Sequence, residues 1–279
     1  MDHEKRAAFL IFLCMLYFGI SGIMVKVLNV NPGSLFLLMV FLLGIVGLAV
    51  TLIKKQRVYL KKYPVFYLLL AIFFTMNVLS FYKSYQTTTL ANAVLSHYTA
   101  PIFIAVLAPF LLKERLETSS IIALAISTFG LFLIVGPEKL SFSNSDFIGV
   151  LYGTLSGIGY AFQVILYRYH PEIKVGPLIA VPSLISILFV VPFFSFQDFA
   201  MVNKALLLPY AVITPLVVTL YAFAVKHVRA QFAGIIGYTE IISVTIFGFF
   251  LLNETPTLLT FIGGLLIIIS GLLIIRKLR

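Results

Sequence analysis

The sequence contains the same apolar segment twice, about 140 residues apart, and each copy is long enough to lie within a membrane span. The copies read ANAVLSHYTAPIFIAVLAPFLLKERLET from Ala91 and QFAGIIGYTEIISVTIFGFFLLNETPTL from Gln231. At a constant offset of 140 residues, eight of 28 positions are identical. Aliphatic identities arise by chance in such segments, but Tyr-Thr followed at fixed spacing by Phe-Leu-Leu-x-Glu is harder to obtain by chance. Duplicated membrane units of this kind are typical of secondary transporters, whose substrate site lies between the halves.

The composition indicates an integral membrane protein. Of the 279 residues, 61% are hydrophobic and 11% are charged, against about a quarter charged in soluble domains. A soluble fold of this length cannot bury so much apolar surface. The single cysteine, Cys14, excludes a disulfide within the chain. Because only helices satisfy their own backbone groups within one segment in lipid, we expect an all-α membrane protein.

Apolar runs of about 20 residues predict ten transmembrane helices. The first is too long for a signal peptide and is followed by no small-residue cleavage site, so we expect it to be retained. The polar stretch 137–146 is the expected hinge between two five-helix repeats, residues 1–139 and 140–279. The predicted spans are 7–27, 34–53, 64–85, 90–112, 118–136, 147–168, 176–195, 205–225, 230–252 and 257–275.

The distribution of Lys and Arg predicts how these spans are oriented. With a cytoplasmic N-terminus, 16 of the 20 basic residues fall in inner segments and four in outer ones, as the positive-inside rule requires. We therefore expect both termini in the cytoplasm, in a plasma (inner) membrane of prokaryotic type. The net charge of +10 is explained by topology and anionic lipid headgroups, and needs no nucleic-acid partner.

The odd number of helices per repeat predicts that the two repeats are inverted relative to each other. The first copy of the repeated segment then runs from outside to inside, and the second from inside to outside. Inverted repeats can exchange conformations, which gives alternating access to a site at the bilayer midplane.

These features resemble the drug/metabolite transporter superfamily, specifically its chains with two EamA-type domains. In that family, the fourth helix of each repeat has small residues, a mid-helix Pro and a terminal Glu. Here the first copy supplies Ala93, Pro101 and Glu114, and the second supplies Ala233 and Glu254, with Ile241 where the family often has Pro. The resemblance covers nearly the whole chain and implies the ten-helix inverted-repeat fold. It leaves the substrate open, since members export amino acids, move other metabolites or exchange nucleotide sugars.

Glu240 is the strongest candidate for a functional residue. Of the ten acidic residues it alone falls in the middle of a predicted span, about 15 Å from the inner end at 1.5 Å per residue. A charge at that depth is costly, by about 2.5–3.5 kcal/mol on insertion scales. Its counterpart in the first copy is Ala100, so the charge breaks the repeat. The alternative is a permanently protonated Glu that only bonds a neighbouring helix.

His97 is the second candidate, about 10 Å below the outer end of its span. Its counterpart is Gly237. Burial disfavours a charged His and a nearby carboxylate restores it, so a His97–Glu240 pair would titrate near neutral pH and could couple transport to protons. A neutral His held by an interhelical hydrogen bond is the alternative.

Polar and aromatic side chains on the first, third, fourth, sixth, eighth and ninth spans complete the expected substrate cavity. At any single position such a side chain can serve only to join helices. Aromatic faces together with one carboxylate favour an ammonium-bearing ligand. The candidate lining residues, besides Glu240 and His97, are Tyr17, Asn77, Ser96, Tyr160, Gln163, Tyr221 and Tyr238.

The expected function is secondary active transport, by alternating access, of a small metabolite. An amino acid or related amine is the favoured substrate, export the favoured direction, and proton coupling is possible. The sequence contains no phosphate-binding glycine loop, paired acids or Cys/His ligand cluster, so we expect no enzyme activity, cofactor or metal. We expect the protein to be a monomer or homodimer. The alternatives are another substrate class (nucleotide sugar, nucleoside or organic cation), a non-transporting membrane partner protein, and a lipid-modifying enzyme.

Overall fold

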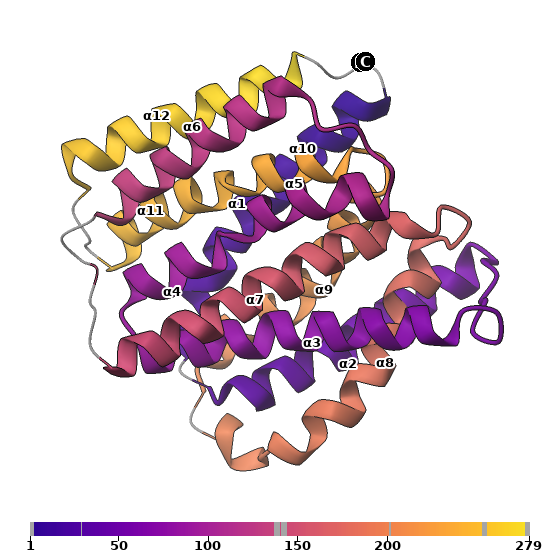
Figure 1. The fold of residues 1–279 in the computed structure, drawn as a ribbon. Helices are drawn as coiled ribbons and strands as arrows, with labels where there is room; N and C mark the ends of the chain where they lie inside the picture. The colour runs from indigo at the N-terminus through magenta and orange to yellow at the C-terminus, as the bar shows by residue number, and fades with distance from the viewer. Residues whose placement is uncertain are drawn as a thin grey trace.

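The computed structural model describes residues 3–28, 30–136, 140, 144–200, 202–252 and 256–276. All regular structure in these residues is helical (Figure 1). The α-helices are α1 (His3–Leu28), α2 (Pro32–Ile53), α3 (Pro64–Thr87), α4 (Leu90–His97), α5 (Ala100–Leu111), α6 (Thr118–Val135), α7 (Asn144–Tyr169), α8 (Val175–Val190), α9 (Lys204–Val225), α10 (Ala230–Gly237), α11 (Thr239–Leu252) and α12 (Leu258–Ile275). Two short 3₁₀ helices, η2 (Val191–Phe193) and η3 (Phe196–Phe199), follow α8.

The helices confirm the predicted all-α membrane fold. By length and composition, nine segments of the described chain are apolar enough to cross a membrane, and α12 supplies a shorter apolar helix. Two of the nine are each built from two helices in succession, α4 with α5 and α10 with α11. The start of α1 and the end of α12 lie at the same end of the bundle (Figure 1), as an even number of spans requires.

Local sequence sets several helix ends. Pro32 occupies the first turn of α2, and the side chain of Asn31 accepts a hydrogen bond from the N–H of Gly33. Gly136 ends α6 with a φ of 81°, which favours glycine. Glu254, residues 137–139 and residues 141–143 of the predicted hinge lie outside the described residues.

The two copies of the repeated segment are each broken at the same place, which the ten-helix prediction did not include. Tyr98 and Thr99 separate α4 from α5, and the equivalent Tyr238 separates α10 from α11. The second break forms without a proline at position 241. It follows Gly237, a residue type with low helix propensity, and the Tyr238 N–H bonds the Ile235 carbonyl in a tighter turn, at 3.2 Å.

The repeated threonines satisfy backbone groups at the two breaks. Thr99 Oγ1 donates a hydrogen bond to the Ser96 carbonyl at 2.6 Å. Thr239 Oγ1 donates one to the Ile236 carbonyl at 2.7 Å. A broken helix in lipid needs such partners, because no water is present to replace the lost backbone bonds. The identity of Thr99 and Thr239 therefore has a structural cause.

The helices pack in pairs that the repeat relates to each other. Helix α3 packs on α7 as α9 packs on α1, and α5 packs on α7 as α11 packs on α1. Helices α2 and α8 pack on each other, as do α6 and α12 along one edge of the bundle (Figure 1). Gly130 and Gly263 allow the last pair to approach closely: a Cβ on Gly263 would lie 2.4 Å from the Gly130 carbonyl oxygen.

Candidate functional site

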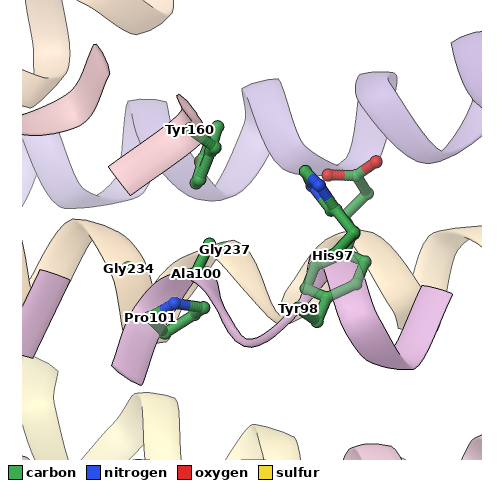
Figure 2. Close-up of a pocket in the computed structure, with 8 residues that line it drawn as sticks. His97, Tyr98, Ala100, Pro101, Tyr160, Gly234 and Gly237 are labelled. Atoms are coloured by element: carbon green, nitrogen blue, oxygen red, sulfur yellow. The ribbon is translucent and has the colours of Figure 1, made fainter. Parts of the chain in front are cut away.

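A narrow cavity lies at the two helix breaks. Its walls come from α4 and α5, from α7, and from α10 and α11, so both repeats contribute. Figure 2 shows His97 and Tyr98 on one side of the first break and Ala100 and Pro101 on the other, with Tyr160 reaching in from α7. The lining residues are His97, Tyr98, Ala100, Pro101, Tyr160, Gly234, Gly237 and Glu240.

Glu240 lies at the centre of its membrane span. The span runs from Ala230 to Phe250, and Glu240 is ten residues from each end. The break places it in the first turn of α11, where the helix dipole favours a carboxylate. The Tyr98 side chain lies close enough to Glu240 to interact with its carboxyl group. The helix N-terminus therefore lowers the cost of a carboxylate at this depth, and the Tyr98 hydroxyl is a nearby polar group.

The two repeated tyrosines have taken different roles. Their rings stack with centroids 5.9 Å apart. Tyr238 points its hydroxyl at the first break, where it donates to the Tyr98 carbonyl at 3.1 Å and lies 3.0 Å from Thr128 Oγ1. Tyr98 instead reaches Glu240. The two tyrosines differ in role because the two copies differ at the next equivalent position: Ala100 in the first copy corresponds to Glu240 in the second.

His97 is anchored by a buried polar network that joins α4, α7 and α3. Its Nδ1 lies 2.8 Å from Ser156 Oγ, and the Ser156 hydroxyl lies within donating distance of the carbonyl and side-chain oxygens of Asn77, at 2.8 and 3.0 Å. Asn77 Nδ2 donates to Gln163 Oε1 at 3.0 Å, and Gln163 Nε2 donates to the Tyr167 hydroxyl at 2.8 Å. The predicted residues His97, Asn77 and Gln163 therefore belong to one network.

The network determines which ring nitrogen of a neutral His97 holds the proton. The Ser156 hydroxyl has one proton, and Asn77 accepts it. His97 Nδ1 must then be the donor to Ser156. In the neutral ring, Nε2 is left as the nitrogen that can accept a proton.

Three of the predicted site residues line the cavity, and the other six lie outside its lining. Glu240, His97 and Tyr160 line it. Tyr221 lies directly behind Tyr160, with the two hydroxyl oxygens 2.5 Å apart. Two predicted residues have other partners: Tyr17 bonds Thr214 on α9 at 2.7 Å, and Ser96 donates to the Asn92 carbonyl of its own helix at 2.7 Å. The predicted His97–Glu240 pair stays a prediction: both residues line the cavity, but the hydrogen bond of His97 goes to Ser156.

Sequence reasoning missed Tyr98. The repeat contained the signal, because Tyr98 and Tyr238 are equivalent and only Tyr238 was selected. Tyr98 follows directly after His97 at the end of α4, where a continuous helix would have directed the two side chains to different faces.

The cavity is too small for a metabolite in this conformation. It has room for about one water molecule at most, so a metabolite can enter only if the surrounding helices move apart. The chemistry on its walls is one carboxylate, one imidazole and two phenols, from Glu240, His97, Tyr98 and Tyr160. This set can bind a cation, stack on an apolar or aromatic group, and exchange protons.

The known protein family and proteins with similar sequences are transporters. The family model described as the EamA-like transporter family matches residues 5–136 and again residues 147–276. An uncharacterized transporter from Archaeoglobus fulgidus is 28% identical over 223 residues, covering 74% of each chain. Solute carrier family 35 member G1 from Mus musculus is 25% identical over 244 residues, covering 78% of this chain and 61% of the mouse protein.

A solved crystal structure shares the fold, with a TM-score of 0.81 over 96% of this chain and 97% of the other, at 16% sequence identity. An uncharacterized transporter from Helicobacter pylori strain 26695 is also 28% identical, over 71% of this chain and 69% of its own. The two family matches together cover nearly all of the described helices. The chain belongs to the EamA-like transporter family and is a membrane transporter of that family.

Proposed function

We propose that this transporter carries a small amine-bearing metabolite, most simply an amino acid, and that Glu240 binds its ammonium group. The observation that carries the proposal is a single carboxylate at the centre of a membrane span, facing a cavity that two tyrosines line. An ammonium group gains an ion pair with Glu240 and cation–π attraction from the rings of Tyr98 and Tyr160. Because Gly234 and Gly237 have no side chains, the part of the wall formed by α10 leaves space for an apolar side chain of the substrate.

The proposed mechanism is alternating access between inverted repeats, with the two helix breaks as hinges. Each break separates a short half-helix, α4 or α10, from a longer one, so the halves can rotate while Thr99 and Thr239 keep backbone groups satisfied. We propose that the repeats meet between residues 139 and 140, which lies between the two matched ranges. Export is the proposed direction, with both termini in the cytoplasm.

Proton coupling is proposed to involve the exchange of substrate and proton at Glu240. For a simple amine, a carboxylate that binds the ammonium group in one half of the cycle can return protonated in the other, so that neither half moves a net charge at this site. His97 Nε2 is the proposed proton acceptor beside it, because the Ser156 bond occupies Nδ1. We propose that Asn77, Gln163, Tyr221 and Tyr238 hold these groups in position, and that Tyr17 and Ser96 contact substrate only after the cavity widens.

A ligand screen followed by counterflow tests the proposal. The purified protein is heated in detergent with amino acids, amines, nucleosides or nucleotide sugars, and ligands that raise the melting temperature are then used radiolabelled in proteoliposomes. We expect stabilisation and counterflow with amino acids or amines. Stabilisation by nucleotide sugars alone, with counterflow of the same compounds, would contradict the assignment of substrate class.

A further inference from the structure

A group of charged residues lies at one end of the helices that form the site. It lies where α5 ends, where α7 ends, and where α9 connects to α10. Of these helices, α5, α7 and α10 also line the cavity, and this group of charged residues is at the end expected to face the cytoplasm. None of its residues belongs to the cavity lining.

Glu114 and Arg168 form the centre of this group. Arg168 Nη2 lies 2.7 Å from Glu114 Oε1, and the two side chains are only 20% and 9% exposed. Glu114 also accepts the Ala230 N–H at the start of α10, at 3.0 Å. Arg168 Nη1 donates to the Val225 carbonyl at the end of α9, at 3.3 Å. One ion pair therefore joins the first repeat to three points of the second.

We propose that the Glu114–Arg168 ion pair is the gate that closes the substrate path to the inner face of the membrane. Opening of the cavity toward that face separates α5, α7 and the start of α10, and the pair, with the Ala230 bond of Glu114, is a buried polar contact that joins all three. This role of the ion pair does not depend on which substrate the protein carries.

The position and bonding of the pair suit a contact that opens reversibly. Glu114 lies beyond Leu111, the last residue of its membrane span, and Arg168 is the second-last residue of the span Asp146–Tyr169. Both charges therefore lie at the membrane edge, where separation exposes them to water. Burial raises the pKa of the Glu114 carboxyl, and the nearby Arg168 opposes this effect. Arg168 Nε is buried without a hydrogen-bond partner in the described chain, so the closed state leaves one donor for water to satisfy on opening.

A neighbouring ion pair provides a matched control. Arg229 bonds Glu117 in the same region, but the side chains are 43% and 34% exposed. Exposed pairs contribute little because water already solvates both charges. If closure depends on buried charge pairing, Arg229→Gln should leave the inner end closed.

The test measures access to the cavity from each face without any substrate. A reporter, Gly237→Cys, is placed in a Cys14→Ser background. Gly237 lines the cavity, and a Cβ there meets only the Tyr160 hydroxyl, at 3.8 Å. Labelling by a membrane-impermeant maleimide is timed in right-side-out and inside-out vesicles, for Arg168→Gln, Glu114→Gln, Arg168→Lys and Arg229→Gln.

We expect Arg168→Gln and Glu114→Gln to accelerate labelling from the inner face by at least about tenfold, since removing one partner of a buried pair strongly disfavours the closed state. Arg168→Lys keeps the charge and should restore slow labelling, and Arg229→Gln should label at the original rate. Unchanged inner-face labelling in folded Arg168→Gln and Glu114→Gln proteins would overturn the proposal. Failure of both to fold would also overturn it, because the pair would then be a structural tie.

Discussion

Gly157 sets how closely α7 approaches the first helix break, and replacing it tests that geometry. In Gly157→Ala, the added Cβ would lie 2.7 Å from the His97 carbonyl oxygen, 3.0 Å from Thr99 Oγ1 and 3.3 Å from the Ala100 nitrogen. Ordinary contacts begin at 3.4 Å, so α7 or the break must move by about 0.7 Å, the difference between 3.4 and 2.7. The two nearest atoms belong to the break that shapes the cavity.

The expected cost combines two opposing effects. Overpacking of this size costs about 1–3 kcal/mol, whereas replacing a helical Gly by Ala contributes about 1 kcal/mol of helix propensity. Gly22→Ala on α1 provides the control, because a Cβ there meets no atom within 4 Å and only the propensity changes. We therefore expect Gly157→Ala to be less stable than Gly22→Ala by about 1–3 kcal/mol.

The difference is measured as the free energy of unfolding in mixed micelles, followed by circular dichroism because the chain contains no Trp. Both proteins carry the same substitution type, so the comparison cancels the propensity effect. Equal unfolding free energies for Gly157→Ala and Gly22→Ala would refute the close approach of α7 to the break. Such a result would also mean that this contact does not determine where the cavity lies.

Three further outcomes are expected. Thr99→Val and Thr239→Val should each lower the free energy of unfolding by about 1 kcal/mol, the usual net contribution of one intramolecular hydrogen bond. Wild-type stability in both would show that the hydroxyls do not support the breaks. Burial lowers the pKa of Lys226 from 10.5 to about 8. Between about pH 8 and 10.5 the unfolded chain therefore binds more protons at Lys226 than the folded chain does, and the free energy of unfolding of the wild type should rise with pH relative to that of Lys226→Gln. A stability difference between the two proteins that does not change with pH would contradict this. In a Cys14→Ser background, Gln197→Cys should react with an impermeant maleimide from outside and Lys61→Cys only from the cytoplasm; the reverse pattern would contradict the predicted topology.

The sequence predicted the fold well because membrane spans are determined by length and hydropathy. Ten spans in two repeats follow from apolar runs and from the repeated segment, without knowledge of tertiary contacts. The break at Tyr238 could not be predicted in that way. With Ile241 in place of Pro, nothing in the backbone forbids a continuous helix, and the break depends on Gly237, on the Thr239 hydroxyl and on the helices packed around it.

The candidate site was predicted only in part, for a related reason. Glu240, His97 and Tyr160 were found because ionisable and aromatic side chains are costly or prominent at mid-span positions. Ser96 was selected as part of a stripe along one continuous helix. Its hydroxyl instead bonds its own backbone, and a stripe that continues past the break at Tyr98 no longer follows one face.

The role of Glu240 is tested most directly by counterflow with Glu240→Gln protein in proteoliposomes, using a substrate identified by the ligand screen. Gln keeps the shape and hydrogen bonding of the side chain but removes its titratable charge, and stability should be equal or slightly higher. We expect counterflow to fall sharply, or to lose its pH dependence between about pH 5.5 and 8 if Glu240 carries the coupling proton. Folded Glu240→Gln protein that transports normally across this range would contradict the assignment of Glu240 as the residue that binds substrate or proton.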